Sequence, residues 1–347
     1  MNVSIVTVYN STNCGSFLQA YGLKYVLEKN GCNVTFLKTG VKNNKKIFLK
    51  KALSNIKKRR FSKIGFDYKV YRNFESAIKR FSLLDFKPQM VSNQDLFVLG
   101  SDEIWNASRK VIKDSEVFFG KGLDGRIISF APSVNVATVD DMLKVAAIKD
   151  YINKLDKISV RDSHSKEVIG KLTDKDIKIV CDPTFLLPME EYNKLEGKCD
   201  IDNFIMVYSA GGRFDSERKK DIKDFAKACN KKLVAFPHKL DWCDYQFPAD
   251  PFDAIAFFKK ADFVITDTFH GAALSLIFNK NFVAIPQENR KVTELLEYFG
   301  LENLIVDETK GLCEFFSKEQ YSKEKLNERI YEERKKADDY LVSALNN

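Results

Sequence analysis

The feature that most constrains the fold is a regular alternation of short, buried-type β-runs with longer helical stretches. This order is typical of α/β proteins with parallel sheets. The first run, 3–8 (VSIVTV), leads through a loop into a helical stretch over about 16–30 that ends at Gly31. A run over 34–37 completes a βαβ unit. Helices are also predicted near 69–81 and 140–154, and further runs over 95–99, 127–130, 157–160 and 177–180.

The same alternation begins again after a charged stretch at about 190–202 that has no strand character. In the second half, runs are predicted over 204–208, 232–236, 263–266 and 282–285. We therefore predict two Rossmann-like domains that face a central cleft, one over 1–195 and one over 196–347. The second domain is expected to end in a long charged helix over 317–345. A chain of 347 residues is long enough for two such domains.

Composition and cysteine spacing exclude several classes of protein. The seven cysteines include no CxxC pair and there are only three histidines, so we expect no disulfide framework, no metal site and no cofactor. The most apolar long stretch, 263–285, contains Asp267, His270 and Lys280 and is not a membrane span. The first ten residues lack the features of a secretory leader. These observations predict a cytoplasmic protein.

The net charge of +8 is concentrated in one segment. Residues 41–66 contain ten Lys and Arg and no acidic residue, and 8 − 10 leaves about −2 for the rest of the chain. Apolar residues interleave with these cations at roughly helical spacing. This basic insertion is predicted to be a surface helix that docks on anionic lipid at the inner face of the plasma membrane, or else a solvated insertion. Nucleic-acid binding is not expected, because no nucleic-acid-binding motif accompanies the charge.

The most informative stretch is 262–281, where a β-run leads into TDTFHG and then into a helix of small and apolar residues. Ligands of open α/β sheets bind beyond the carboxyl ends of the strands, and a helix N-terminus there favours an anion. We expect Asp267 or Thr268 to cap the helix, and Gly271 to let a ligand approach closely. His270 is expected to contact a phosphate or to transfer a proton. The alternative is a surface histidine beside an ordinary helix cap.

Polar residues also follow the run over 95–99, in the sequence GSDEIWN. Carboxylates accept hydrogen bonds from hydroxyls and an indole face stacks on a sugar ring, so this segment suits a sugar-binding site. The candidates are Ser101, Asp102, Glu103, Trp105 and Asn106. The alternative is a capped turn with a packing tryptophan.

The loop after the first run supplies three more candidates for the cleft, Asn13, Gly15 and Gln19. This loop is not a GxGxxG sequence, so no dinucleotide fingerprint is predicted.

Basic residues follow two other runs. Arg161 comes directly after the run over 157–160, where it can hold a carboxylate or phosphate through two hydrogen bonds. An ion pair with Asp162 or Asp182 is an equally good interpretation. Arg290 and Lys291 follow the run over 282–285 and are expected to complete a basic lining.

Six blocks of the sequence, in order, resemble the polysaccharide pyruvyl transferases over nearly the whole chain. They are VYNSTNCGSFLQAYGL (8–23), DLFVLGSDEIWN (95–106), ISFAPS (128–133), ISVRDSHS (158–165), VCDPTFLL (180–187) and DFVITDTFHGAALSLIFNK (262–280). The sequence departs from the family pattern at Cys14, Ser16 and Glu103, all in the half that would hold the acceptor.

The resemblance implies a fold like that of GT-B glycosyltransferases and a bacterial enzyme that needs no cofactor. Its reaction would transfer the pyruvyl group of phosphoenolpyruvate to two hydroxyls of a sugar, giving a cyclic ketal and phosphate. The acceptor would belong to a cell-surface polysaccharide, such as an exopolysaccharide, or to its lipid-linked precursor.

On this interpretation the C-terminal half binds the donor and the N-terminal half binds the acceptor. The donor-binding residues would be Arg161, Thr268, His270, Gly271, Arg290 and Lys291. The acceptor-binding residues would be Asn13, Gly15, Gln19, Ser101, Asp102, Trp105 and Asn106. His270 would be the acid/base, and Asp102 or Glu103 would orient or deprotonate the acceptor.

Two alternatives of other classes remain. One is a glycosyltransferase of similar shape that uses a nucleotide-sugar, with the same helix N-terminus at the diphosphate. The other is a non-catalytic relative that binds a glycan or an anion.

Overall fold

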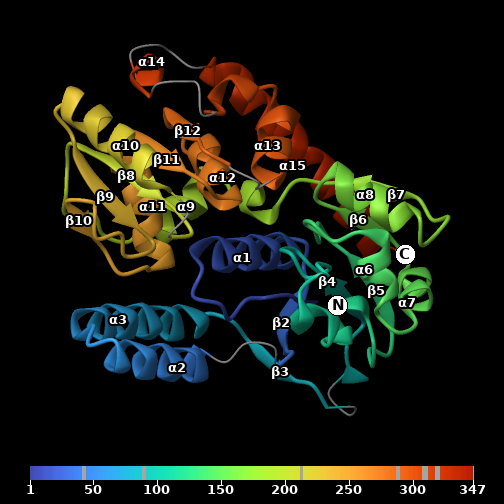
Figure 1. The fold of residues 1–347 in the computed structure, drawn as a ribbon. Helices are drawn as coiled ribbons and strands as arrows, with labels where there is room; N and C mark the ends of the chain where they lie inside the picture. Colours follow the sequence, from blue (N-terminus) through green and yellow to red (C-terminus); the bar gives the residue numbers. More distant parts are fainter. Residues whose placement is uncertain are drawn as a thin grey trace.

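Two five-stranded parallel sheets form the body of the molecule in the computed structural model (Figure 1). The structure describes residues 1–40, 44–87, 91–211, 214–286, 290–306, 312–316 and 321–346. The N-terminal sheet has the order β3-β2-β1-β4-β5, and its strands are Leu83–Asp85, Asn33–Lys38, Asn2–Val6, Leu96–Leu99 and Arg126–Ser129. The C-terminal sheet has the order β10-β9-β8-β11-β12, with strands Tyr245–Gln246, Lys232–Phe236, Phe204–Tyr208, Phe263–Thr266 and Phe282–Ala284.

The two sheets are wound in the same order, which confirms the predicted pair of Rossmann-like units. A further parallel pair, β6 (Ile158–Val160) and β7 (Ile177–Ile179), continues the N-terminal sheet through a bridge between Ile128 and Lys157. We propose the domain boundary between α9 (Met189–Leu195) and β8.

Several helices of the N-terminal half begin where a short polar side chain caps them, namely Asn13, Thr138, Asp162 or Asp182. The remaining elements of this half are α1 (Cys14–Lys29), α5 (Lys110–Lys113), η1 (Glu116–Phe119), α6 (Val139–Leu143), α7 (Ile148–Lys154), α8 (Ser163–Gly170) and η2 (Pro183–Leu186). The prediction of a single helix over 140–154 is wrong, because the structure has two shorter helices, α6 and α7, in this segment. A capping box between Thr138 and Asp141 starts α6, and Ala147 then adopts a left-handed φ of 53°, which interrupts the helix before α7.

Helices of the C-terminal half cover its sheet and then return to the first half. They are α10 (Ser216–Ala228), α11 (Pro251–Lys260), α12 (Phe269–Ile277), α13 (Arg290–Phe299), η3 (Glu302–Leu304), α14 (Cys313–Phe316) and α15 (Lys323–Leu345). The predicted C-terminal helix is present as α15, capped by Ser322; residues 317–320 lie outside the described ranges.

The last helix ties the end of the chain to the N-terminal sheet (Figure 1). The Tyr340 hydroxyl donates to the Ser129 carbonyl at 2.7 Å, and the Arg126 guanidinium donates to the Ala344 carbonyl at 2.9 Å. A continuous apolar core also joins the halves through α1, where the Phe17 ring meets the Phe252 ring edge-on at 5.5 Å. Packed side chains therefore form the bottom of the cleft between the sheets.

The basic insertion folds into two helices that run antiparallel, α2 (Asn44–Lys57) and α3 (Phe61–Ile78), which we call the hairpin (Figure 1). The Asn55 amide donates to Asp67 at 3.1 Å, and the Phe48 ring stacks on the Tyr71 ring at 5.5 Å. The Asn73 amide donates to the Ala249 carbonyl at 3.2 Å, so the hairpin leans on the C-terminal half. Residues 41–43 of the insertion lie outside the described ranges.

None of the helices in the described ranges is long and apolar enough to cross a membrane.

Candidate active site

The N-termini of α1 and α12 meet between the two sheets, so closely that only glycine fits there. A Cβ atom built on Gly15 would lie 2.0 Å from Cγ of His270, and one built on Gly271 would lie 2.0 Å from the Thr266 hydroxyl. Thr268 caps α12 by accepting the Gly271 N–H at 3.0 Å. The prediction that Gly271 leaves room for a ligand is therefore wrong, because protein atoms fill that space.

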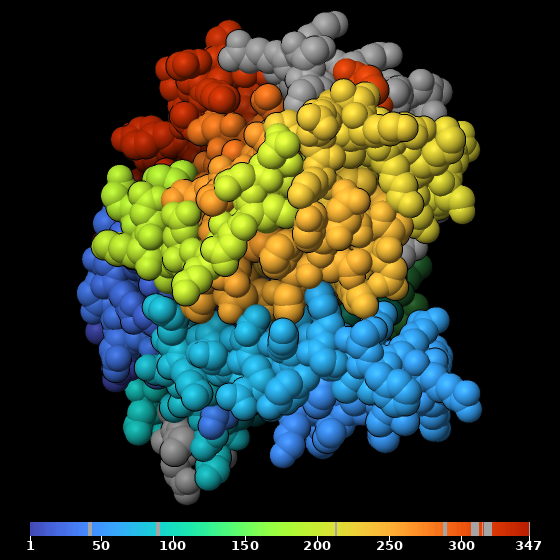
Figure 2. All heavy atoms as spheres, turned by 90° about the vertical axis from the view of Figure 1, so that its left-hand side faces the viewer, coloured from blue at the N-terminus to red at the C-terminus, as the bar shows by residue number. Residues whose placement is uncertain are grey.

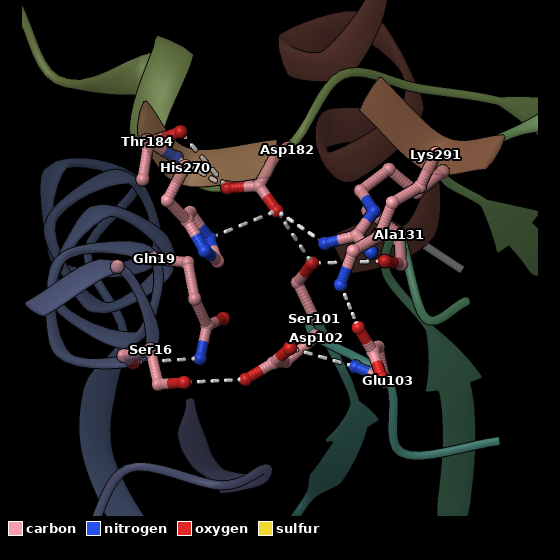
Figure 3. Close-up of polar contacts among 12 residues, drawn as sticks. Ser16, Gln19, Ser101, Asp102, Glu103, Ala131, Asp182, Thr184, His270 and Lys291 are labelled. Carbon is pink, nitrogen blue, oxygen red and sulfur yellow. Dashed lines mark hydrogen bonds and ion pairs between the residues drawn. The ribbon is translucent and has the colours of Figure 1, made fainter. Parts of the chain in front are cut away.

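Asp182 lies at the centre of the polar network around these helix ends (Figure 3). Its Oδ2 accepts from Arg161 Nη1 at 2.9 Å and from the Ser101 hydroxyl at 3.3 Å, and it lies 3.9 Å from His270 Nε2. Its Oδ1 accepts from the backbone and the hydroxyl of Thr184. Burial raises the pKa of Asp182, but His270, Arg161 and these hydrogen bonds outweigh that effect and hold the pKa below its usual value. Asp182 is therefore a buried carboxylate.

His270 is almost fully buried, with 8% of its surface exposed, so the alternative of a surface histidine is wrong. Its Nε2 has no hydrogen-bond partner among the described residues. Burial lowers the pKa of His270, although Asp182 and Asp102 oppose the effect. The imidazole is therefore neutral at neutral pH, with a carboxylate beside Nε2 that stabilises the ring once it gains a proton.

Arg161 forms the ion pair with Asp182 that the sequence left open, at 2.9 Å, and both side chains are buried. The guanidinium also lies over the ring of Phe269, 4.2 Å from its centroid. Arg161 Nε has no hydrogen-bond partner in the described ranges. The structure thus fixes Arg161 beside the helix that carries His270.

Two pockets adjoin at Asn13, which lines both of them. The first, which we call the His270 pocket, is lined by Asn13, Tyr208, Ser209, Ala210, Pro237, His238, Thr268, Phe269, His270 and Lys291. The second, which we call the Asp102 pocket, is lined by Val8, Asn13, Ser16, Asp102, Glu103, Arg109, Val111 and Ile112. Asn13 also caps α1, accepting from the Gly15 N–H at 2.9 Å.

Polar contacts on the Asp102 side fix two carboxylates and cross the cleft (Figure 3). Asp102 accepts from the Ser16 hydroxyl at 2.7 Å, and Glu103 accepts from the Asn135 amide at 2.9 Å. Lys291 at the start of α13 donates to Glu103 and so joins the two halves. Burial raises the pKa of Glu103, but Lys291 outweighs it and the pKa lies below its usual value. Glu103 is therefore a weak base held in an ion pair.

Four predicted acceptor residues lie beneath the site rather than in it. Trp105 is fully buried and its indole N–H donates to the Phe118 carbonyl at 2.9 Å, so the predicted stacking on a sugar is wrong and the packing alternative is correct. Ser101 and Gln19 are also fully buried, and Asn106 is 2% exposed. The Ser101 hydroxyl donates to Asp182 and the Gln19 amide donates to the Thr7 hydroxyl, both at 3.3 Å, so these buried side chains support the site from within the protein.

The predicted basic lining is only partly present. Arg290 is exposed and pairs with Glu294 of its own helix at 2.6 Å, and it lines neither pocket. Lys291, one residue later, lines the His270 pocket. In the described ranges, no group of three or more His, Cys, Asp or Glu side chains is placed to hold a metal ion.

Sequence reasoning missed the role of Asp182, and it named Asp267 only as a possible cap of α12, a position that Thr268 holds instead. Asp182 was considered only as a partner for Arg161; the signal was an Asp-Pro turn directly after a strand. Asp267 is fully buried, where it accepts from the Ser209 hydroxyl at 2.9 Å and from the Ala210 N–H at 3.0 Å. It therefore orders the loop after β8 that lines the His270 pocket.

Solved structures similar to this one share its fold at low sequence identity. UDP-GlcNAc 2-epimerase from Neisseria meningitidis, bound to UDP-GlcNAc, is 10% identical with a TM-score of 0.54, and the match covers 99% of each chain. A putative UDP-N-acetylglucosamine 2-epimerase from Listeria monocytogenes is 12% identical with a TM-score of 0.53, over 98% of this chain and 89% of that one. UGT89C1 of Arabidopsis thaliana, complexed with UDP, is 12% identical with a TM-score of 0.54, over 99% and 98%. These likenesses show a GT-B-type fold of two Rossmann-like domains.

A model of one protein family matches most of the chain. The family is described as polysaccharide pyruvyl transferase, and the match runs over residues 13–289, which includes the loop at Asn13 and the helix of His270. A comparison with curated proteins found no match. The chain belongs to the polysaccharide pyruvyl transferase family.

Proposed function

We propose that this chain transfers the pyruvyl group of phosphoenolpyruvate to two hydroxyls of a sugar in a polysaccharide or its precursor, forming a ketal. The observation that carries the proposal is the meeting of two pockets at Asn13, with His270 in the wall of one and Asp102 in the wall of the other. A transfer reaction needs such a junction, because donor and acceptor must approach each other inside the same cleft.

The chemistry of the His270 pocket suits an anionic donor. Its described lining contains Lys291 and the capped start of α12 and no carboxylate. Phosphoenolpyruvate carries a phosphate and a carboxylate, and the positive end of a helix favours both. Arg161 supports this wall from behind, through Asp182 and Phe269.

His270 is the group best suited to move the protons. Ketal formation removes one proton from each of two hydroxyls; one proton goes to the methylene carbon of the donor and the other leaves with the phosphate. The imidazole that gains a proton as the donor binds gives this proton to the methylene carbon and then accepts the proton of the first hydroxyl. Asp182, 3.9 Å from Nε2, stabilises the imidazolium form. Asp102 accepts a hydrogen bond from the acceptor and orients it, while Glu103, paired with Lys291, fixes the loop.

Mass spectrometry of the product tests the reaction. Candidate sugars are incubated with phosphoenolpyruvate, and the expected result is an acceptor that gains one pyruvyl unit for each phosphate released. Release of phosphate by wild type with no modified sugar in any acceptor, including lipid-linked ones, contradicts the proposal.

A second candidate function is glycosyl transfer from a nucleotide-sugar, which the GT-B-type fold favours. Ligand-induced thermal stabilisation distinguishes the two. We expect phosphoenolpyruvate to raise the melting temperature and UDP alone to leave it unchanged. The reverse pattern supports the glycosyltransferase.

We also propose that the hairpin rests on an anionic membrane surface at the inner face of the plasma membrane. Leu49, Leu53 and Ile56 are 48%, 61% and 49% exposed and follow one another at helical spacing along α2. Lys50 and Lys51, which lie between Leu49 and Leu53, and Lys57, which follows Ile56, supply the charge for an anionic surface. In Figure 2 the hairpin forms the light-blue edge of the molecule, below the C-terminal half.

A further inference from the structure

We propose that the space between the hairpin and the C-terminal half binds a diphosphate group joined to the acceptor sugar, an assignment that rests on the pyruvyl transfer proposed above. This space, which we call the hairpin pocket, is larger than the His270 pocket and the Asp102 pocket. Cationic or titratable side chains line it from both sides, namely Lys51, Lys58, Arg60 and Lys63 from the hairpin and His238 and Lys239 from the loop after β9.

The protein neutralises little of the positive charge that the hairpin brings to the pocket, although Lys239 on the other side pairs with Asp241 at 3.4 Å. In the part of the chain that the structure describes, none of the four hairpin cations forms an ion pair. Asp67 is the carboxylate in the described lining, and it already accepts from Asn55 at 3.1 Å. Burial lowers the pKa of His238, and Lys51 and Lys63 add to the effect while Asp67 opposes it. An anion is therefore the ligand that this pocket favours.

The hairpin pocket continues into the site. Ala210, Pro237 and His238 line both the hairpin pocket and the His270 pocket, and Thr12 of the hairpin pocket precedes Asn13. A sugar that reaches Asn13 from the hairpin side leaves its attached group among the hairpin cations.

The grouping of cations favours adjacent phosphates over separate carboxylates. The hairpin brings three ammonium groups and one guanidinium to one pocket, and an arginine fork binds phosphate oxygens in pairs. The exposed apolar face at Leu49, Leu53 and Ile56 lies on the same helix as Lys51. A diphosphate that connects a sugar to a lipid therefore meets both surfaces, whereas one that connects it to a nucleoside meets only the pocket.

Calorimetric titration with inorganic diphosphate, at saturating phosphoenolpyruvate, tests the pocket. The pocket variant is K51Q/K58Q/R60Q/K63Q. The matched control is K50Q/K57Q/R59Q/K69Q, which removes the same charge from exposed hairpin residues that do not line the pocket. We expect the dissociation constant to rise about 100-fold in the pocket variant, or about threefold for each of the four cations that contact the ligand. We expect a rise of no more than about threefold in the control, because its four cations make no contact with the ligand and act only through screened long-range attraction.

Equal weakening in the two variants, or no weakening in either, overturns the proposal. If the fourfold variant does not fold, K51Q/K58Q provides the same comparison against K50Q/K57Q, with an expected loss of about tenfold.

Two further probes identify what the diphosphate is attached to. UDP represents a nucleoside and farnesyl diphosphate in detergent represents a lipid. If one of the two probes binds more tightly than inorganic diphosphate, and the pocket variant loses this binding, the proposal is supported and the carrier is identified. If both probes bind the wild type and the pocket variant equally well, the proposal is overturned.

Thermal stabilisation by phosphoenolpyruvate keeps this inference separate from the proposed function. The pocket variant is expected to retain that stabilisation. If wild type is stabilised by phosphoenolpyruvate but shows no pocket-dependent diphosphate binding, the inference fails alone. If wild type binds diphosphate in the pocket but neither binds phosphoenolpyruvate nor forms a ketal, pyruvyl transfer fails and the diphosphate site stands without its acceptor role.

Discussion

At the scale of single residues, the site depends on how closely His270 is packed. The ring lies against Gly15, beside the buried carboxylate of Asp182, and edge-on to Phe269 at 5.2 Å. These neighbours leave the imidazole few alternative orientations. Proton transfer at a fixed distance needs that restriction.

Replacing His270 by Asn tests its role as acid/base. The amide keeps hydrogen-bonding groups but cannot titrate, so we expect turnover at saturating donor to fall by about 10²–10⁴-fold. H164N is the control, because His164 bonds the Ala137 carbonyl and lines neither pocket of the site. Near-wild-type turnover in a folded H270N protein contradicts the catalytic role, and a change in KM alone makes His270 a binding residue.

Donor binding is expected to take up a proton near neutral pH. Burial holds the pKa of free His270 below 6.5, so its imidazole is mostly neutral at pH 7. A bound anion favours the charged form and raises that pKa, so protons enter as the donor binds. Calorimetry in buffers of different ionisation enthalpy measures the uptake, and H270N corrects for protons carried by the ligand. The same proton count in both proteins refutes the expectation.

Gly15→Ala tests the packing itself. The new Cβ atom would lie 2.0 Å from the imidazole, which must therefore move, and a displacement of about 1 Å can cost about 10²-fold in turnover. Gly65→Ala is the control, since no atom lies within 4 Å of its Cβ position. That change inside α3 is expected to leave turnover unchanged and to stabilise the protein by about 0.5–1 kcal/mol. Equal turnover in both variants shows that the close contact is not required.

The sequence was sufficient to find His270, Asn13 and Lys291 in the site, because the carboxyl ends of strands and helix N-termini can be located from residue patterns. It was not sufficient for side-chain direction. Trp105 follows a strand as expected, yet Asp102 has a left-handed φ of 72° and the chain then turns the indole into the core. Asp182 was missed for the opposite reason, since an Asp-Pro turn is common and its partners come from distant segments.

At the scale of helices and strands, the periodicity of apolar residues predicted the bounds of an element correctly where local backbone conformation did not interrupt it. β9 and β11 have the predicted bounds, whereas the helix predicted over 140–154 is split at Ala147. A count of charges could not reveal how the side chains of the hairpin are arranged. The same two helices carry an exposed apolar face, a group of cations that line the hairpin pocket and a second group of cations that do not line it.

The apolar face of the hairpin is tested by L53Q/I56Q. Both side chains are exposed, so the change should spare the fold but remove about tenfold or more in binding to anionic vesicles. V136Q/L143Q is the control, with side chains 57% and 50% exposed in the N-terminal half. Equal vesicle binding by the two variants contradicts a membrane role for α2.

At the scale of the whole molecule, stability is shared between the halves. α15 starts beside the C-terminal half, where Asn327 contacts Asn279 at 3.0 Å, and ends on the N-terminal sheet at Tyr340. Lys291 and Glu103 form a second link across the cleft. Each half of the molecule therefore depends on contacts with the other half.

Tyr340→Ala tests the link made by α15. The change removes a buried ring and its hydrogen bond to Ser129, so we expect a loss of about 3–5 kcal/mol in the free energy of unfolding. Tyr331→Ala is the control on the same helix, where the side chain is 68% exposed and the expected effect is small. Urea denaturation measures both, and equal midpoints refute the link.

The path of α15 also determines when the protein can finish folding during its synthesis. The ribosome makes the strand that ends at Ser129 more than two hundred residues before it makes Tyr340, which contacts that strand at 2.7 Å. Domains often fold one after another as they emerge. Here the N-terminal sheet lacks its contact with α15 until the C-terminal domain has been synthesised, so the surface that Tyr340 covers at Ser129 stays exposed during that time. The nascent N-terminal domain therefore needs protection, by chaperones or by fast translation, for as long as the second domain takes to be made.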